Sequence, residues 1–358
     1  MNWFFDFPTS AKLLSWVYEK NGGPTIDGVI AITPGVVEDM LGLLGPVDLP
    51  SYNITFTKEQ VFDTLQYEVE ENYKTRGIKD PKNIITDFAP LLVKRLAEYP
   101  DKEKVAELFV NSLAKKDVLA FMKEEKEEAF FLYQNWGGSM LEDTDSDYLA
   151  VVDSNINGYK TDRVVNQSVH VKTAFEPSGE IVNTVTITRE HKGGDLPYEW
   201  YNKVNANFLR VYVPKGATLL EARGQTPESH QPRIDYKARG FQALALLADE
   251  KNETIDSQSG THLFEEGGKS VFGNWTYVSP GEMTTIVYRY KLPFAIHPLE
   301  GTFPYQLTLQ KQPGISETFS WDVTYPSSWH VAWKSDTPSL LDRDTRLGIL
   351  FEQSEGKT

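Results

Sequence analysis

The apolar residues of this chain change their spacing near residue 148. Before this point they recur with a helical period, in segments near residues 11–20, 35–45, 57–67, 82–98, 102–115 and 117–135. One short β-branched run, Gly28–Ile32, ends at Thr33-Pro34 and predicts a strand. The first part of the chain is therefore predicted to be an α/β domain rich in helices.

After Tyr148, apolar and polar residues alternate with period two, as in Val169, Val171 and Thr173. Clusters of Pro, Gly, Asn and Asp separate these runs, a pattern typical of antiparallel sandwiches. The second part is therefore predicted to be an all-β antiparallel sandwich. We expect roughly half of the following residues from its alternating runs to face one common core: Trp275, Tyr288, Tyr290, Trp321, Val323 and Tyr325.

These patterns divide the chain into four parts. We expect an α/β domain at residues 1–137, an acidic linker at 138–147, a β-sandwich at 148–340 and a mobile tail at 341–358. The first ten residues have neither the basic nor the apolar region of a signal peptide, and they resemble the interior of a domain. We therefore expect the natural gene to begin upstream, with any membrane anchor in that missing segment.

Charge and composition exclude several classes of protein. The chain has 358 residues, a net charge of −15 and no cysteine. The negative charge disfavours nucleic-acid binding, and the lack of cysteine excludes disulfides, thiolate zinc sites and cysteine nucleophiles. No stretch approaches the roughly 20 apolar residues of a membrane span. Residues 1–147 carry 26 acidic and 15 basic side chains, so the first part is the more acidic one.

Few side chains form patterns that indicate catalysis or metal binding. The six histidines are scattered without HxH or HxxxH spacing, so we expect no metal site. The chain lacks a Gly-x-Ser-x-Gly elbow, a Walker phosphate loop and a Gly-x-Gly-x-x-Gly motif. Catalytic residues therefore stay unknown, and the residues alone do not decide whether the protein is an enzyme.

The most unusual segment runs from Val151 to Asp162, where an apolar strand ends in small polar and charged residues. Asp153, Asn155, Lys160 and Asp162 could form a ligand site for an anion, or a site of oxygen ligands for a metal. The alternative is an Asx turn with a neutralising Lys160–Asp162 pair that only fixes the junction between domains. If the four side chains form a site, we expect them to converge at the end of the strand and face the α/β domain.

Several phrases resemble an uncharacterised bacterial family, catalogued as domain of unknown function four-thousand-twelve. They are Phe4–Ala11 (FFDFPTSA), Gly22–Ala31 (GGPTIDGVIA), Leu44–Val47 (LGPV), Val151–Asn155 (VVDSN) with Lys160–Asp162 (KTD), and Leu309–Gly314 (LQKQPG). The phrases recur in order over nearly the whole chain. Members of that family usually have an N-terminal membrane anchor, so the resemblance implies that the full-length protein is anchored.

The first part also resembles, more faintly, the LytR-CpsA-Psr fold, in the order strand Val29–Ile32, helix Gly35–Leu44, Gly-Pro-Val, and a helix at Ile84–Ala97. That resemblance implies transfer of glycopolymers onto the cell wall, with arginines and magnesium at a pyrophosphate. This chain has Tyr67-Glu68-Val69-Glu70 and Pro81-Lys82-Asn83 where that family places arginines, and glutamates would repel a pyrophosphate.

These observations support two hypotheses about function. The first is an extracytoplasmic protein of the bacterial cell envelope that binds a surface polymer or a surface protein, without a cofactor. The alternative is a glycopolymer transferase of the LytR-CpsA-Psr type that uses magnesium, with its arginines in the missing segment. Neither hypothesis involves nucleic acid.

Overall fold

The structure is a computed structural model that describes residues 3–77, 80–142, 146–228, 234–242, 244, 250–296 and 301–353. The chain forms two compact units. The helical unit is Val17–Ser139, and the β-rich unit combines Met1–Trp16 with Met140–Thr358. The division falls inside the first helix, α1 (Phe7–Lys20).

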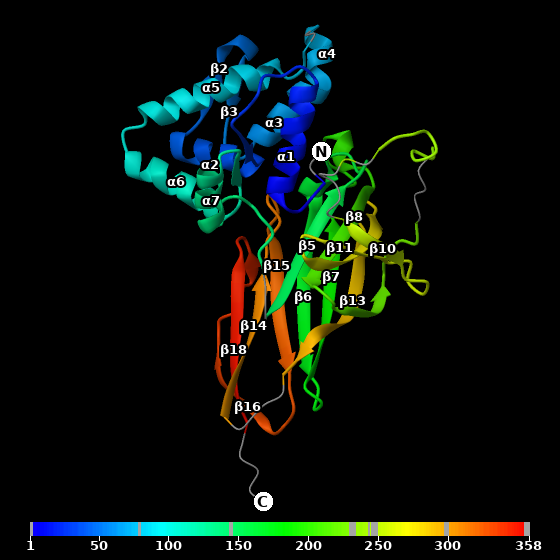
Figure 1. The fold of residues 1–358 in the computed structure, drawn as a ribbon. Coiled ribbons are helices and arrows are strands. Elements are labelled where there is room, and N and C mark those ends of the chain that lie inside the picture. The colour runs from blue at the N-terminus through cyan, green and yellow to red at the C-terminus, as the bar shows by residue number, and fades with distance from the viewer. Residues whose placement is uncertain are drawn as a thin grey trace, which may run out of the picture. The chain divides into compact units, whose positions relative to one another are not determined.

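The helical unit contains short helices and two small sheets (Figure 1). Its elements after α1 are β1 (Gly28–Ile32), α2 (Pro34–Leu44), β2 (Val47–Leu49), η1 (Pro50–Tyr52), β3 (Ile54–Phe56), α3 (Val61–Tyr67), η2 (Glu68–Asn72), α4 (Tyr73–Arg76), α5 (Asn83–Glu98), α6 (Lys102–Ala114), β4 (Val118–Met122) and α7 (Glu125–Tyr133). β1 pairs with β4 and β2 pairs with β3, both antiparallel. The expected strand at Gly28–Ile32 is thereby confirmed.

Local signals explain where these helices begin and end. α2 has Pro34 in its first turn, where a missing N–H costs nothing, and Gly45 follows its end at a φ of 75°. The side chain of Asp101 caps α6 by accepting a hydrogen bond from Lys104 N at 3.1 Å. The core of the unit joins α2, β2, β3 and α5 through residues such as Leu41 and Phe88.

The helix expected over residues 117–135 is wrong in its first half. Residues Val118–Met122 form β4, and only Glu125–Tyr133 form a helix, α7. The run Val118-Leu-Ala-Phe-Met122 is continuously apolar, so its spacing alone does not distinguish a helix from a buried strand. Pairing with β1 decides the outcome in favour of the strand.

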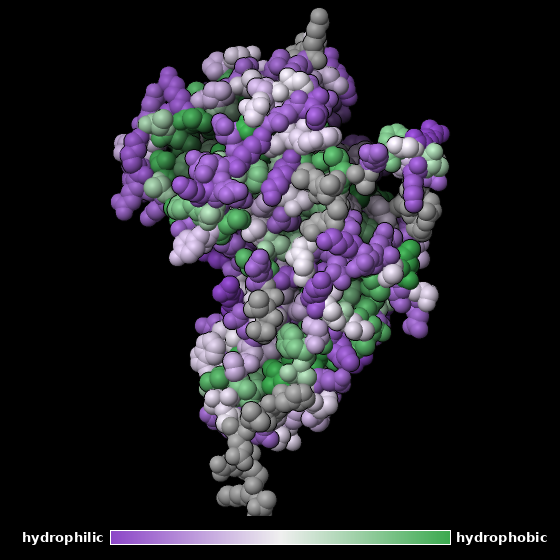
Figure 2. Space-filling model, viewed as in Figure 1, coloured by the Kyte–Doolittle hydropathy of each residue, from purple (hydrophilic) through white to green (hydrophobic). Residues whose placement is uncertain are grey.

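The helical unit exposes several large apolar side chains. On β1, Ile30 and Ile32 are 65% and 59% exposed, and they share one face because strand side chains alternate. Val93 on α5 and Val110 on α6 are 63% and 53% exposed. Around α5 and α6, Figure 2 shows hydrophobic residues in green among the hydrophilic ones. The unit thus combines an acidic surface with scattered apolar positions.

The β-rich unit consists mainly of two large sheets (Figure 1). Its elements are β5 (Asp147–Asn155), η3 (Thr161–Val164), β6 (Val165–Phe175), β7 (Glu180–His191), η4 (Glu199–Tyr201), β8 (Asn205–Pro214), β9 (Thr218–Arg223), β10 (Lys251–Ile255), β11 (His262–Glu266), β12 (Lys269–Val278), β13 (Met283–Ala295), β14 (Gly301–Leu309), β15 (Glu317–Thr324), β16 (Trp329–Lys334), β17 (Leu340–Leu341) and β18 (Thr345–Gln353). The eight-stranded sheet has the order β10-β11-β12-β8-β5-β14-β18-β16, and the six-stranded sheet has the order β17-β15-β6-β7-β13-β9. Neighbouring strands are antiparallel except for the parallel pairs β5–β14 and β6–β15. Helices in the first part and largely antiparallel sheets in the second agree with the expected order of fold types.

One hydrophobic core takes residues from both large sheets. It includes Val151 and Leu209 of the eight-stranded sheet and Val171 and Ile187 of the six-stranded sheet. Of the six side chains selected from the alternating runs, three are buried in this core and a fourth, Val323, packs against it. The three are Tyr288, Tyr290 and Trp321. The period-two pattern therefore predicted the inward faces of these strands correctly.

The other face of the eight-stranded sheet is covered by the start of the chain. Phe5 joins a second apolar cluster with residues of β5, β8, β11 and β12. Beside it, Arg210 and Glu266 form a buried ion pair with 3.2 Å between Nη1 and Oε2. Arg210 Nη2 donates to the carbonyl oxygen of Trp3 at 2.6 Å, and the indole ring of Trp3 lies 4.3 Å from the guanidinium carbon. These contacts fix residues 3–16 to the β-rich unit.

The boundaries of the units differ from those expected from the sequence. The sequence pattern places residues 3–16 in the 1–137 domain, but their packing places them in the β-rich unit. The expected tail at 341–358 contains β18, which lies between β14 and β16 in the eight-stranded sheet; residues 354–358 lie outside the described residues. In the expected linker at 138–147, Met140 and Asp147 are buried, and residues 143–145 lie outside the described residues.

Candidate functional site

The sequence-predicted site residues lie at the end of β5 and in the loop that follows it. Asp153 and Asn155 are in β5, Lys160 precedes the 3-10 turn η3, and Asp162 lies within η3. The strand ends because the chain turns: Asn157 and Tyr159 have φ angles of 66° and 56°, in the left-handed region. The four residues are therefore close in sequence but differ in what their side chains contact.

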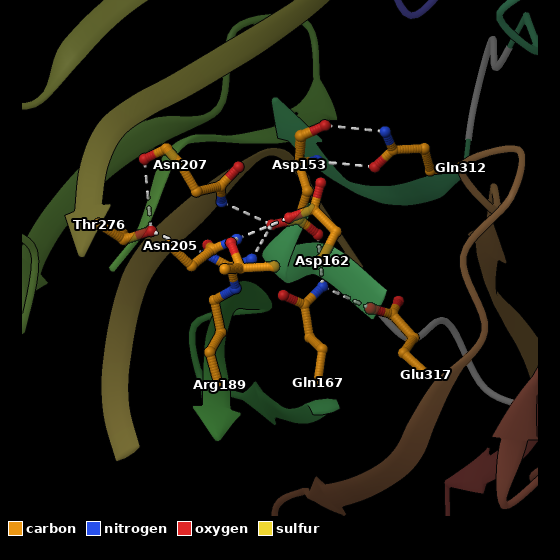
Figure 3. Close-up of polar contacts among 10 residues, drawn as sticks. Asp153, Asp162, Gln167, Arg189, Asn205, Asn207, Thr276, Gln312 and Glu317 are labelled. Carbon is orange, nitrogen blue, oxygen red and sulfur yellow. Dashed lines mark hydrogen bonds and ion pairs between the residues drawn. The ribbon is translucent and has the colours of Figure 1, made fainter. Parts of the chain in front are cut away.

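Asp153 is the centre of a buried polar network between the two large sheets (Figure 3). Its Oδ1 accepts a hydrogen bond from Asn207 Nδ2 at 2.6 Å and lies 3.4 Å from Arg189 Nη2. Its Oδ2 accepts from Gln167 Nε2 at 2.8 Å. Asn207 belongs to the same sheet as Asp153, whereas Arg189 and Gln167 belong to the other sheet. The carboxylate thus links the two sheets through hydrogen bonds and charge.

The backbone of Asp153 is fixed as firmly as its side chain. Gln312 Oε1 accepts a hydrogen bond from Asp153 N at 2.7 Å, and Gln312 Nε2 donates to Asp153 O at 2.9 Å. Gln312 lies in the loop after β14, so this amide side chain acts as a strand partner at the end of β5. The position of Asp153 is therefore determined by both its main chain and its carboxylate.

The other three predicted residues have different roles. Asn155 Oδ1 accepts from Gly158 N at 2.7 Å and closes the turn, as the alternative structural interpretation expects. Asp162 Oδ1 accepts from Asn205 Nδ2 at 2.7 Å, which places it at the edge of the polar network. Lys160 is exposed. The structure brings Asp153 and Asp162 into the network of Figure 3, and a ligand site made of all four residues stays a prediction.

The turn has no room for a side chain at Gly158. A Cβ atom built there would lie 2.6 Å from Asn155 Oδ1 and 2.8 Å from Ala206 N. Gly158→Ala is therefore expected to lower the free energy of unfolding by about 1–3 kcal/mol, because the backbone of β8 must move. Chemical denaturation measures this change. Lys160→Ala, in the same loop but exposed, is the control and is expected to change stability by less than about 0.5 kcal/mol; equal losses in both variants would contradict the steric argument.

Glu317 is a further member of the network that the sequence did not reveal. It begins β15, is 7% exposed, and its Oε2 accepts from Gln167 Nε2 at 2.9 Å. Burial raises the pKa of Glu317 to about 7, and the nearby charge of Asp153 adds to the shift, while Gln167 and Lys311 oppose it. Gln167 thus donates to two carboxylates, one of which titrates near neutral pH.

The residues that the sequence analysis missed share one property. Gln167, Arg189 and Asn207 occupy inward positions of strands whose other inward residues are apolar, for example Val169, Ile187 and Leu209. The signal that could have revealed them is a polar residue at a position where the alternating pattern places apolar residues facing the core. Asp153 likewise points to the same face of β5 as the core residues Leu149 and Val151.

A second candidate surface lies on the outer face of β14, β18 and β16. Trp333 is 57% exposed, and its six-membered ring lies over Gly348, where a Cβ atom would come within 3.0 Å of Cζ3. A shift of register between Val331 and Trp333 turns the indole to the face opposite the core residues of β18. Glycine at 348 therefore leaves the space in which the indole lies against the sheet.

Polar side chains lie on the same face of the sheet as this indole. Gln306 lies opposite Gly348 in the neighbouring strand β14 and is exposed. His330 and Glu352 face each other across β16 and β18, with 2.6 Å between Nε2 and Oε2. A sheet face that carries an exposed aromatic ring together with amide, imidazole and carboxylate groups can combine ring stacking with hydrogen bonds.

The glutamates in the faint LytR-CpsA-Psr resemblance lie in the π-helical turn η2. Glu68 is buried and its Oε1 accepts from Asn72 Nδ2 at 2.8 Å, and Glu70 Oε1 accepts from Gln66 Nε2 at 2.9 Å. These carboxylates are held by amide donors within the helix. Among the described residues, no group of three or more His, Cys, Asp or Glu side chains could hold a metal ion.

Comparison with known proteins gives one family match. Residues 1–69 match the family model described as "Protein of unknown function (DUF4012)". The resemblance to this family is confirmed over these residues; the later phrases lie outside the match, and the likeness to the LytR-CpsA-Psr fold stays a prediction. No curated protein matches the chain. In the part of the chain that is described, no helix is long and apolar enough to cross a membrane.

Solved structures resemble the chain only weakly. A candidate nutrient-binding protein from Legionella pneumophila is 10% identical with a TM-score of 0.24, over 57% of this chain and 71% of that one. The M1 zinc metallopeptidase from Deinococcus radiodurans is 11% identical with a TM-score of 0.17, over 53% of this chain and 42% of that one. Scores this low transfer neither fold nor function.

Proposed function

We propose that the chain is the extracytoplasmic part of a bacterial cell-envelope protein whose β-rich unit, a β-sandwich, binds a surface polymer built of sugar rings. The observation that carries this proposal is Trp333, an exposed indole that lies against the sheet over Gly348. Sugar rings present flat C–H faces that pack on an aromatic face, and their hydroxyl groups bond to side chains such as Gln306, His330 and Glu352. The family match at residues 1–69 names no function and is compatible with this proposal.

The buried network around Asp153 supports the same proposal indirectly. The carboxylate oxygens of Asp153 both accept hydrogen bonds from amides of the chain itself, and the side chain is 6% exposed. A group held in this way serves the link between the two sheets rather than contact with a large polymer. The polymer site is therefore assigned to the exposed face and not to the predicted loop.

Trp333→Ala tests the proposed site. We expect about a tenfold fall in the affinity for purified peptidoglycan sacculi in a sedimentation assay, because a stacked aromatic ring contributes about 0.5–1.5 kcal/mol beyond the area it buries, and tenfold in affinity corresponds to about 1.4 kcal/mol. The control is Tyr133→Ala, which removes an aromatic side chain that is 86% exposed in the helical unit. It is expected to leave the bound fraction unchanged. Equal binding by wild type and Trp333→Ala, or no binding of sacculi by the wild type, would rule out this function for the Trp333 face.

A further inference from the structure

Three amide side chains in the network of Figure 3, those of Gln167, Asn205 and Asn207, have the same orientation. Gln167 and Asn207 turn their NH2 groups to Asp153, and Asn205 turns its NH2 group to Asp162 and Thr161. Their carbonyl oxygens, Gln167 Oε1, Asn205 Oδ1 and Asn207 Oδ1, are buried and accept no hydrogen bond from the protein. Asn205 and Asn207 are both 0% exposed. The network therefore contains three buried acceptors that require donors.

Arg189 adds one unpaired donor to the same network. Its Nη1 donates to Thr276 Oγ1 at 3.3 Å and its Nη2 lies 3.4 Å from Asp153 Oδ1, while Nε is buried without an acceptor from the protein. Arg189 is 2% exposed. It lies directly opposite Gln167 on the neighbouring strand, and Figure 3 shows the amide group of Gln167 beside Arg189.

These four atoms limit what can occupy the network. A cation would satisfy the carbonyl oxygens, but the guanidinium of Arg189 would repel it and its Nε–H would stay unpaired. An anion would satisfy Nε–H but would meet the carbonyl oxygens and the carboxylate of Asp153. A neutral molecule that both donates and accepts hydrogen bonds fits both requirements, and the burial of Asn205, Asn207 and Arg189 restricts it to a small one.

We infer that this end of the intersheet core is a binding site for ordered water. Water molecules donate to the carbonyl oxygens of Asn205, Asn207 and Gln167 and accept from Arg189 Nε–H. Almost all buried polar groups in native proteins are paired with protein or with ordered water, and internal waters typically make about three hydrogen bonds. The waters then belong to the link between the sheets, together with Asp153.

The network reaches the surface at Asp162. Asn205 contacts Asp162, which is exposed, whereas Asn207 and Arg189 are enclosed by both sheets. We therefore expect water to exchange with the solvent beside η3, which contains Asp162. The sequence-predicted loop thus lies next to the network.

A high-resolution crystal structure of the full chain tests the inference directly. We expect ordered water within hydrogen-bond distance of at least two of the four atoms Arg189 Nε, Asn205 Oδ1, Asn207 Oδ1 and Gln167 Oε1. Side chains that reorient to pair with one another in a dry network would overturn it, as would a metal ion identified there by anomalous scattering.

A measurement in solution gives an independent answer. Oxygen-17 relaxation dispersion counts water molecules with long residence times, and we expect Asn207→Leu to lower this count by at least one. A variant at the exposed face, Gln306→Leu, is the control and is expected to leave the count unchanged. If Asn207→Leu does not fold, the count for the wild type still decides: no long-lived water overturns the inference.

Discussion

Arg210→Met is expected to lower the free energy of unfolding of the β-rich unit by about 3–5 kcal/mol. Arg210 is 1% exposed and Glu266 is 0% exposed, so removal of the guanidinium leaves a buried carboxylate without its cation. Burial already raises the pKa of Glu266, and Arg210 opposes this shift. The variant also loses the hydrogen bonds from Arg210 to Trp3 O and Ser154 Oγ. Denaturant titration followed by tryptophan fluorescence measures the loss.

Two further variants separate charge from packing. Arg210→Met combined with Glu266→Leu removes both charges and is expected to recover much of the stability, because a buried ion pair adds little over an apolar pair of similar size. Lys291→Met breaks the exposed pair with Glu180, at 3.1 Å, and is expected to cost less than about 1 kcal/mol. A loss of that small size for Arg210→Met as well would contradict the buried-pair argument.

Glu317 is expected to make the protein less stable as the pH rises from about 4.5 to about 7. Its pKa rises from 4.5 to about 7 in the folded state, so within this interval the folded protein holds a proton that the unfolded chain has released. The contribution of the Glu317 carboxyl to the free energy of unfolding is largest below pH 4.5. It falls between pH 4.5 and pH 7 and stays at its lower level above pH 7. At 1.36 kcal/mol per pKa unit, the total change is at most about 3 kcal/mol.

Glu317→Gln isolates this contribution because glutamine has a similar shape and does not titrate. The difference in stability between variant and wild type is expected to move in favour of the variant between pH 5 and pH 8. Glu180→Gln, an exposed carboxyl that pairs with Lys291, is the matched control and is expected to show a much smaller change. A constant difference between Glu317→Gln and wild type over this range would show that Glu317 does not titrate near neutral pH.

The alternation of apolar residues predicted the β-rich part well, for a physical reason. Residues such as Val169, Val171 and Ile187 face one shared core, and burial on one face fixes the phase of each strand. The same reasoning failed for Val118–Met122. This run is apolar at every position, so it shows neither the period of a strand nor that of a helix. The place of β18 in the eight-stranded sheet depends on contacts with strands far away in sequence, which local patterns do not contain.

The candidate sites were predicted only in part. Asp153 was selected as a polar residue at a strand end, but its partners Gln167, Arg189 and Asn207 come from three other strands. Trp333 was not selected, because its outward direction results from a register shift that no sequence pattern indicates. Local sequence patterns do not show which residues of different strands meet in the folded protein.

The hydrogen bonds of the first residues have a consequence for biosynthesis. Trp3 O bonds to a residue 207 positions later, and Phe5 N bonds to Glu266, 261 positions later. The β-rich unit is a discontinuous domain, with Val17–Ser139 as an insertion between its two segments. On the ribosome, residues 3–16 emerge before the inserted unit and must wait for β8 and β11 before they have a partner, whereas the inserted unit can complete its own core much earlier. The order of folding is therefore expected to be the inserted unit first and the attachment of residues 3–16 last.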